Sequence, residues 1–232
     1  MAQEEIPEEP IEEAQIQPEE ELREINLGAE LGSQKPVFIS SQLMAQKREL
    51  LVALLQKYRG VFAWTYDEMP GLDPGLVVHS LNVNLGVRPV VQPARVFHTE
   101  VEAQIIQEVK KLLTAGFIKP IQHPKWLSNI VPVKKKNGQI RCYVDFRNLD
   151  FRNLNKVCLK DEFPLPNIDL LVDSAAGSSM FSFMDGYSGY NQICLAPKDV
   201  EKTAFKTLIG NIYYTVMPFG LKNAGATYQA AK

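Results

Sequence analysis

Residues 130–146 constrain the fold of this chain more than any other segment. Residues 130–133 are a short, mostly β-branched apolar run, and residues 140–146 are a second run that suits a strand. Between them, a basic turn ends in Asn137-Gly138, a dipeptide typical of tight antiparallel turns because both residues tolerate positive φ. We therefore predict a β-hairpin with the lysines of residues 134–136 at its tip.

Two other segments carry the spacing of amphipathic helices. Apolar residues recur at helical intervals between Ser40 and Gly60, and again between Thr99 and Gly116. We predict that a serine caps the first helix and that Thr99 and Glu102 form a capping box for the second.

The remaining regular pattern belongs to strands. Residues 78–83 alternate like a strand. Together with the hairpin and the two helices, this strand predicts an α+β fold.

The charges divide the chain unevenly. Residues 1–24 hold ten Glu and one Arg, a net charge of -9, so residues 25–232 carry +7 within the total of -2. Residues 1–35 are rich in Glu, Pro and Gln, and we predict a disordered acidic linker there. The basic remainder suits a polyanionic partner such as nucleic acid, but charge alone favours an ordinary solvated surface.

Several classes of protein are disfavoured. The longest apolar run, residues 50–55, is too short to span a bilayer, and the acidic start does not resemble a signal peptide, so we expect an intracellular, soluble protein. No Asp-Thr-Gly or Asp-Ser-Gly of an aspartic protease occurs. No C-x-x-C or H-x-x-H spacing indicates a zinc site or a disulfide framework, and we assign no role to the isolated residues of these types: Cys142, Cys158, Cys194, His79, His98 and His123.

Residues 180–193 hold the first candidate site. Asp185 closes a short apolar run and is expected at a strand end, where a carboxylate can hold a divalent cation. Gly186, Ser188 and Gly189 are small and would let backbone N–H groups approach a phosphate, and Tyr190 is close enough to face a sugar. An Asp turn that joins a strand to a helix explains the same spacing equally well.

Two further segments could contribute to such a site. The hairpin lysines and Arg141 project the point charges and forked donors that bind phosphates, although a solvated turn is the simpler interpretation. In residues 214–229, a strand is expected to lead through a Pro-Phe-Gly turn into a helix, which is also a common connection.

Together these segments resemble the reverse transcriptases of gypsy-type LTR retrotransposons, in the plant-like Pol polyproteins, over about residues 76–229. The motifs occur in the family's order, and residues 40–95 resemble its segment between protease and polymerase. The motifs are Val131-Pro132-Val133-Lys134-Lys135-Lys136-Asn137-Gly138, Val144-Asp145-Phe146-Arg147-Asn148-Leu149, Phe163-Pro164-Leu165-Pro166, Phe183-Met184-Asp185, Ser188-Gly189-Tyr190-Asn191-Gln192-Ile193 and Met217-Pro218-Phe219-Gly220-Leu221-Lys222-Asn223-Ala224.

The resemblance implies a right-hand polymerase in which residues 95–232 form the fingers and a partial palm. Residues 36–94 would then be the connecting segment, and residues 1–35 the linker. It also implies that Asp185 is the first metal-binding carboxylate, helped by the carbonyl of Gly186, with Mg²⁺ or Mn²⁺ as the ion.

The resemblance also implies roles around an incoming dNTP. Ser188 and Gly189 would offer backbone N–H groups to the triphosphate, and Tyr190 would exclude a ribose 2′-OH. The remaining contacts come from the fingers and the later turn: Lys135 and Arg141 to the triphosphate, Phe219 and Gly220 lining the pocket, and Lys222 nearby. The partners would be an RNA or DNA template-primer and other Pol-derived chains, in a cytoplasmic particle or the nucleus, within a DNA integration cycle.

The chain departs from the family in its acidic residues. The family carries an aromatic-x-Asp-Asp hairpin after the Gly220 motif, but no acidic residue follows Glu201 here. One carboxylate cannot hold two metal ions, so we expect that these 232 residues alone do not polymerise. The leading interpretation is therefore an inactive polymerase fragment. A non-catalytic nucleic-acid-binding remnant is the second interpretation, and an interaction module with an acidic tail is the third.

Two smaller departures concern loops. The pentapeptide Asp145-Phe146-Arg147-Asn148-Leu149 is repeated at once as Asp150-Phe151-Arg152-Asn153-Leu154, and five extra residues would reverse the faces of a strand unless a loop absorbs them. Whether Arg147 or Arg152 takes the family position is open. Gly225 also stands where the family usually has Pro.

Overall fold

The computed structural model describes residues 21–28, 34–134, 140–146, 154–164, 166–178, 181–182, 184 and 186–231. The described residues divide into two compact units, one that ends at Met69 and one that begins at Pro70. No helix among the described ranges is both long and apolar enough to cross a membrane.

The smaller unit contains a hairpin followed by a helix. Strands β1 (Leu22–Asn26) and β2 (Pro36–Ser40) pair antiparallel, with Leu22 opposite Ser40 and Asn26 opposite Pro36. The prediction of disorder over residues 1–35 is therefore wrong for β1. The sequence of β1 does not alternate between apolar and polar residues, so the strand is recognised by its pairing with β2 and not by a pattern of its own. Residues 1–20 and 29–33 lie outside the described ranges.

Helix α1 (Ala45–Lys57) and the short turns η1 (Arg59–Val61) and η2 (Tyr66–Glu68) complete this unit. The helix begins after Met44 without a side-chain cap, so the predicted serine cap is wrong. Its apolar residues include Leu50 and Leu54, which are 73% and 53% exposed, and no α1 residue is buried. Helical spacing thus predicted the helix correctly but not the burial of its apolar face.

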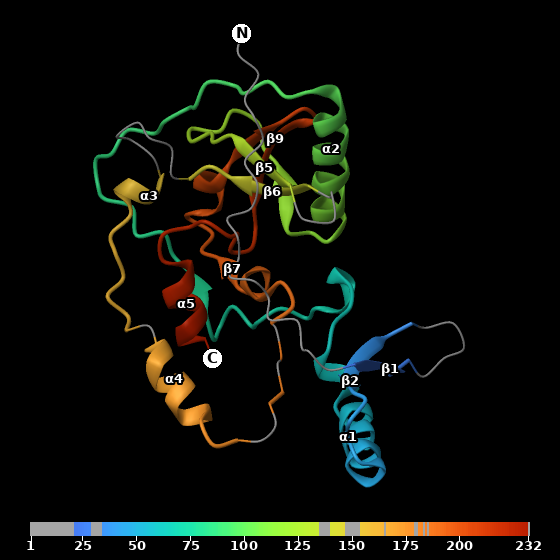
Figure 1. Ribbon diagram of the computed structural model, residues 1–232. Coiled ribbons are helices and arrows are strands. Elements are labelled where there is room, and N and C mark those ends of the chain that lie inside the picture. Colours follow the sequence, from blue (N-terminus) through green and yellow to red (C-terminus); the bar gives the residue numbers. More distant parts are fainter. Residues whose placement is uncertain are drawn as a thin grey trace. The chain divides into compact units, whose positions relative to one another are not determined.

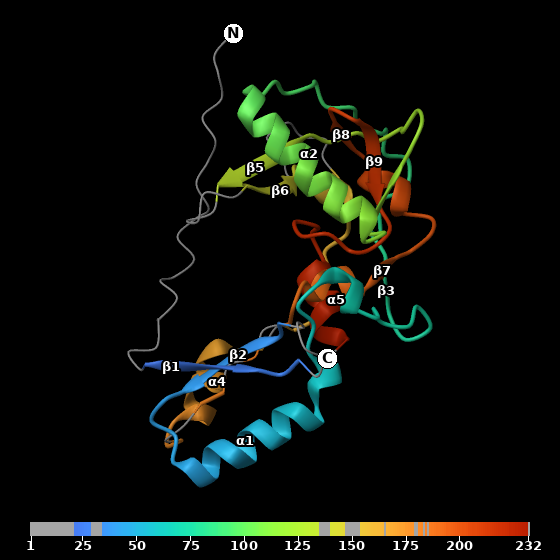
Figure 2. The ribbon, with the colours of Figure 1, turned by 90° about the vertical axis from the view of Figure 1, so that its right-hand side faces the viewer.

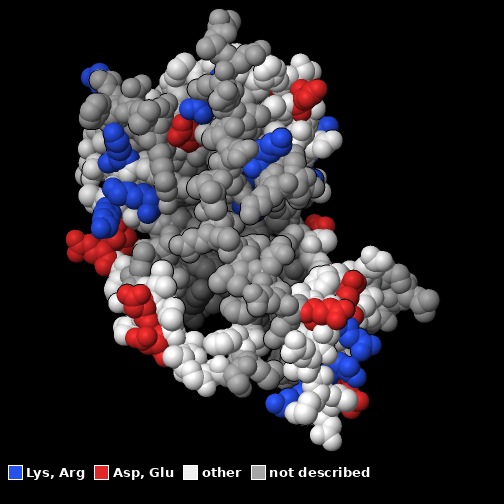
Figure 3. Space-filling model, viewed as in Figure 1, with Lys and Arg blue, Asp and Glu red and all other residues white. Residues whose placement is uncertain are grey.

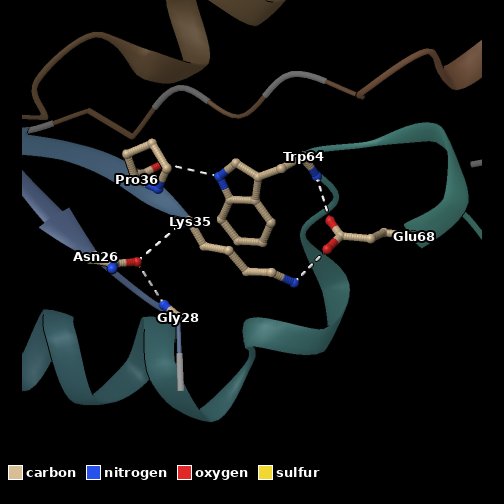
Figure 4. Close-up of polar contacts among 6 residues, drawn as sticks. All are labelled: Asn26, Gly28, Lys35, Pro36, Trp64 and Glu68. Atoms are coloured by element: carbon tan, nitrogen blue, oxygen red, sulfur yellow. Dashed lines mark hydrogen bonds and ion pairs between the residues drawn. The ribbon is translucent and has the colours of Figure 1, made fainter. Parts of the chain in front are cut away.

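A polar contact joins the hairpin to the segment after α1 (Figure 4). The Lys35 ammonium lies 2.6 Å from a Glu68 carboxylate oxygen and 5.0 Å from the centroid of the Trp64 ring. The Trp64 indole N–H donates to the Pro36 carbonyl at 3.1 Å, and the Trp64 backbone N–H donates to Glu68 at 2.8 Å. The ring is therefore held from the hairpin and from η2 at once.

The larger unit is α+β, as predicted from the sequence. Its helices and turns are α2 (Thr99–Thr114), α3 (Leu154–Val157), α4 (Ile168–Ala175), η3 (Gly189–Gln192), η4 (Val200–Thr203) and α5 (Ala224–Ala230). Its strands are β3 (Val78–His79), β4 (Ile118–Pro120), β5 (Ile130–Lys134), β6 (Ile140–Val144), β7 (Cys194–Leu195), β8 (Phe205–Thr207) and β9 (Gly210–Tyr214). They form a parallel β3–β7 pair, a β4–β9–β8 sheet and the antiparallel β5–β6 hairpin.

The hairpin and its covering helix confirm two predictions. Ile130 lies opposite Val144 in the β5–β6 register, and α2 packs beside β6 in both views (Figures 1 and 2). The helix buries four residues of its predicted apolar face: Val101, Ile105, Val109 and Leu112. Gly116 follows at φ +74°, a left-handed conformation that suits glycine at a helix end.

Three local predictions differ from the structure. The N-cap of α2 is His98 without a side-chain cap, so Thr99 lies inside the helix and the predicted capping box is not formed. The strand expected over residues 78–83 is limited to β3, because the chain then turns through Asn82 at φ +48°. The strand expected before Asp185 is not formed by residues 181, 182 and 184, which have no regular secondary structure.

Residues 72–95 form an extended strap along the larger unit. The Leu72 N–H donates to the Gln192 carbonyl at 2.7 Å, and the Ala196 N–H donates to the His79 carbonyl at 2.8 Å. Further along, Arg95 forms an ion pair with Asp145 at 3.1 Å. The strap is therefore held in place by residues that come much later in the sequence.

Replacing Glu68 with Gln tests the contact in the smaller unit. The Lys35 ammonium lowers the pKa of the Glu68 carboxyl, so this pair stabilises the fold above the ordinary carboxyl pKa and loses its effect as the pH falls through the lowered value. Glu68→Gln keeps an acceptor for Trp64 but removes the ion pair. We expect amide hydrogen exchange in residues 34–40 and 62–68 to become a few-fold faster at neutral pH, with the difference fading in acid. Glu49→Gln on α1 is the control, and equal exchange in both variants would contradict the prediction.

Candidate active site

Two of the predicted motif segments meet in an aromatic cluster made of Tyr190, Phe219 and Tyr228. Tyr190 comes from η3, Phe219 from the turn after β9, and Tyr228 from α5. The ring centroids of Tyr190 and Phe219 are 4.8 Å apart at an interplanar angle of 31°, and those of Tyr190 and Tyr228 are 5.1 Å apart at 64°. Both arrangements lie within the range favoured for aromatic pairs, so the cluster fixes the two segments against each other.

The Tyr228 ring lies directly on two glycines. A Cβ atom added at Gly186 would lie 2.5 Å from the Tyr228 hydroxyl oxygen. A Cβ atom added at Gly189 would lie 2.6 Å from that oxygen and 2.9 Å from two ring carbons. These positions need glycine because the phenol occupies the space that a side chain would fill.

The turn between the glycines is closed by its own hydrogen bonds. The Gly189 N–H donates to the Gly186 carbonyl at 2.9 Å, and Ser188 has φ +46°, in the left-handed region. The Ser188 hydroxyl accepts a bond of 2.8 Å from the Asn191 side chain. The N–H that we predicted for the triphosphate and the carbonyl that we predicted for the metal are thus bonded to each other here, although a carbonyl oxygen can accept a second bond.

The second motif forms a turn that a preceding segment holds in place. Gly220 has φ +93°, and a Cβ atom at this position would lie 3.7 Å from the Val144 carbonyl oxygen. The Asn155 side chain donates to the Gly220 carbonyl at 2.7 Å and accepts from the Lys222 N–H at 2.9 Å. Phe219, next to this turn, is 44% exposed, so one part of the cluster faces solvent.

Lys222 is an exposed residue whose ammonium reaches back to the chain after α3. Its ammonium donates to the Cys158 carbonyl at 2.8 Å, and the Asn223 side chain beside it donates to the Leu159 carbonyl at 2.7 Å. The charge of Lys222 is therefore used here to hold the segment after α3.

The predicted residues of the fingers are only partly visible. Arg141 lies on β6, where its guanidinium donates to the Tyr143 hydroxyl at 3.1 Å. Val144 lies three residues later on the same strand, and its carbonyl is close to the Gly220 turn. Lys135 and Asp185 lie outside the described residues.

The metal prediction rests on Asp185, and the described residues do not supply a site in its place. No three His, Cys, Asp or Glu side chains gather within the described ranges in a way that could hold an ion. The described chain therefore offers the Gly186 carbonyl as the one predicted metal ligand that can be located, and we derive no step through a metal.

His79 was given no role from the sequence, but the structure buries it against α5. Its side chain is 1% exposed, and Nδ1 lies 2.8 Å from the Thr227 hydroxyl, one residue before Tyr228. Its Nε2 is buried without a hydrogen-bond partner among the described residues. Burial lowers the pKa of His79 to about 4, although the nearby carboxylates of Asp199 and Asp161 act in the opposite direction.

Other contacts at the site were also missed. Asn155 and Tyr228 stand in or beside the quoted motifs, but no spacing rule indicates that one holds the Gly220 turn and the other covers two glycines. The buried Asp199 accepts from the Leu81 N–H of the strap at 2.9 Å and pairs with the Lys202 ammonium. A lone Asp in a sequence gives no signal of this kind.

The chain is similar to reverse transcriptases and to Pol polyproteins of retrotransposons. Residues 133–231 match the model of the family described as reverse transcriptase (RNA-dependent DNA polymerase). The chain is 34% identical over 148 residues to the retrovirus-related Pol polyprotein from transposon opus of Drosophila melanogaster, covering 61% of this chain and 14% of that protein. It is 36% identical over 124 residues to the corresponding polyprotein from transposon gypsy of the same species, covering 53% and 12%.

The fold agrees with a solved viral structure. The foamy viral protease-reverse transcriptase in complex with dsDNA matches with a TM-score of 0.63 at 18% identity, covering 82% of this chain and 38% of that chain. This likeness shows the fold, and the short coverage shows that the 232 residues span a small part of the length of their Pol relatives.

The two glycines allow a test of the Tyr228 contact. Gly186→Ala would place its new methyl against the hydroxyl group alone, whereas Gly189→Ala would also meet ring carbons. We expect each to lower the free energy of unfolding by about 1–3 kcal/mol, the usual cost of overpacking. Adding Tyr228→Phe should restore most of the stability of Gly186→Ala and little of that of Gly189→Ala.

Urea unfolding of the four variants and of Tyr228→Phe alone measures these couplings as a double-mutant cycle. Gly60→Ala is the control, because nothing lies within 4 Å of the added atom. Equal rescue of both glycine variants would contradict the packing described here.

The buried His79 should make stability depend on pH. Its folded pKa of about 4 lies below the unfolded value of 6.5, so only the unfolded chain takes up the proton between these values. Stability should therefore be complete above pH 6.5 and fall by on the order of 3 kcal/mol as the pH drops towards 4. Denaturant unfolding from pH 4 to 7 measures this slope, which His79→Gln should reduce and His98→Gln, at an exposed position, should leave unchanged.

Proposed function

Because residues 133–231 form part of a reverse transcriptase domain whose homologues include the gypsy Pol polyprotein, we propose that this chain is a fragment of an RNA-directed DNA polymerase. In this proposal, residues 95–232 are the fingers and a partial palm, residues 36–94 are the connecting segment and residues 1–35 are a linker. The reaction of the complete enzyme is the attack of a primer 3′-OH on the α-phosphate of a dNTP, which releases pyrophosphate.

The approach of Tyr190 to Phe219 carries the proposal. Tyr190 and Phe219 lie 29 positions apart in the sequence, yet their ring centroids are 4.8 Å apart, beside the Gly220 turn. An aromatic wall next to two glycine-containing turns gives a nucleotide an apolar surface together with close backbone. This supports a pocket in which Tyr190 faces the sugar and limits a 2′-OH, with Phe219 and Gly220 on its other side.

The other roles follow from the family pattern. We propose Asp185 and the Gly186 carbonyl as ligands of Mg²⁺ or Mn²⁺, and Ser188 and Gly189 as donors to the triphosphate. Binding would then require the Gly189 N–H to exchange its present partner, the Gly186 carbonyl.

The basic residues are assigned in the same way. Lys135 and Arg141 are proposed as contacts to the triphosphate from the fingers. Lys222 is proposed to lie near the nucleotide. Its ammonium is bonded to the Cys158 carbonyl, so we propose that it acts by holding the neighbouring turn in place.

The proposed partner is an RNA or DNA template-primer. The related foamy viral enzyme has been solved with dsDNA. In this chain, basic side chains gather around α3, whereas acidic side chains lie along α4 (Figure 3). Other Pol-derived chains, and a particle in the cytoplasm or the nucleus, complete the proposed setting.

Primer extension tests the catalytic part of the proposal. The 232 residues hold no acidic residue after Glu201, so a two-metal site would lack its second source of carboxylates. With a primed RNA template, dNTPs and Mg²⁺, we expect no extension by this chain above the level of Asp185→Asn. Extension that disappears in Asp185→Asn would overturn the expected inactivity and would show that another carboxylate completes the site.

Binding separates the fragment from the alternative of a non-catalytic remnant. Fluorescence anisotropy with the same template-primer should show binding that weakens steeply between 50 and 200 mM salt, as phosphate contacts do. The polymerase proposal further expects that a matching dNTP with Mn²⁺ strengthens this binding, whereas the next dNTP in sequence does not. Salt-sensitive binding without a dNTP effect would favour the non-catalytic remnant, and salt-independent binding would favour a protein-interaction module.

A further inference from the structure

The repeated pentapeptide can be assigned position by position, because each copy is partly described. Residues 145 and 146 of the first copy and residue 154 of the second are visible, together with Asn155 directly after the repeat. The equivalent pairs are Asp145 with Asp150, Phe146 with Phe151, and Leu149 with Leu154. In each pair one member lies among the described residues, and its contacts are shown by the structure.

The first copy supplies the aspartate and the phenylalanine. Asp145 receives the Arg95 guanidinium at 3.1 Å, and its backbone carbonyl accepts from the Gln92 side chain at 3.0 Å. Its N–H donates to the Asn129 carbonyl at 2.9 Å. Phe146 is 1% exposed, one of the largest fully buried side chains among the described residues.

The second copy supplies the leucine. Leu154 is 3% exposed and starts α3. The Asn155 N–H that follows it donates to the Phe146 carbonyl at 3.2 Å, so the two ends of the repeat meet. The repeat also begins after β6 ends at Val144, so the extra residues leave the strand register unchanged.

We propose that five of the repeated residues, 147–151, are surplus: the first copy provides the Asp145 and Phe146 anchors, and the second provides the Leu154 anchor. Removing residues 147–151 leaves Asp145-Phe146-Arg152-Asn153-Leu154, which is one intact copy. The Asn155 N–H would then be four residues after the Phe146 carbonyl. This is the i→i−4 spacing of a helical turn, so three residues can span the gap that eight now span.

The assignment matters for the candidate site because Asn155 also holds the Gly220 turn. Its side-chain amide donates to the Gly220 carbonyl and accepts from the Lys222 N–H. A Cβ atom added at Gly220 would lie 3.8 Å from the Phe146 ring. Phe146 before the surplus residues and Asn155 after them therefore both lie at this turn. The chain can accommodate the duplication without displacing the Gly220 turn only if Phe146 and Leu154 keep their positions.

The repeat provides its own matched controls for thermal unfolding of the full chain. Phe146→Ala and Leu154→Ala should each lower Tm by on the order of 10 °C, the usual effect of removing a buried large side chain. The equivalent substitutions Phe151→Ala and Leu149→Ala should change Tm by less than about 2 °C. The milder pair Phe146→Leu and Phe151→Leu gives the same comparison if Phe146→Ala does not fold.

The deletion of residues 147–151 is the decisive variant. We expect a chain that folds with unchanged or raised Tm, because a shorter loop costs less entropy to close. An unfolded deletion variant, or a loss of Tm in Phe151→Ala equal to that in Phe146→Ala, would overturn the assignment. The outcome is independent of polymerase activity, so failure here would leave the proposed function standing.

Discussion

The packing of the Tyr228 ring on Gly186 and Gly189 is the contact on which the candidate site depends. A phenol cannot approach backbone this closely unless both positions lack a Cβ atom, and the same phenol ring packs against Tyr190, which in turn packs against Phe219. Since α5 carries Tyr228, the placement of this short helix determines the shape of the turn after Asp185. The site is therefore built by tertiary packing, with little support from long helices or a wide sheet.

The strap extends this dependence to residues that precede both motif segments in the sequence. It bonds the end of η3 through Leu72, and it bonds α5 through His79 and Thr227. Both sides of the Tyr228 contact are thus held from one extended segment, whose own position is maintained by the buried carboxylate of Asp199. A buried charge with a bonded lysine and a bonded backbone N–H costs much to disrupt, which makes this polar group a firm anchor. Residues 72–95 contribute in this way to the geometry around the aromatic cluster.

The sequence predicted those parts of the fold that depend on neighbours in the chain. The β5–β6 hairpin followed from Asn137-Gly138 between apolar runs, and the buried face of α2 followed from helical spacing. The meeting of Tyr190 with Phe219 was expected from the family resemblance and not from any spacing rule. His79 and Thr227 lie 148 positions apart, and no local pattern relates such residues. β1 was missed because its acidic surroundings dominated the composition and its own five residues do not alternate between apolar and polar.

The repeated pentapeptide shows why a motif match alone cannot assign a residue. In a single copy, one arginine stands directly after the buried phenylalanine and two positions before the buried leucine. Here Arg147 keeps the first spacing and Arg152 keeps the second, so neither has both. The duplication thus leaves each arginine with one of the two spacings of a single copy, while Phe146 and Leu154 are both buried and Phe146 lies beside the Gly220 turn.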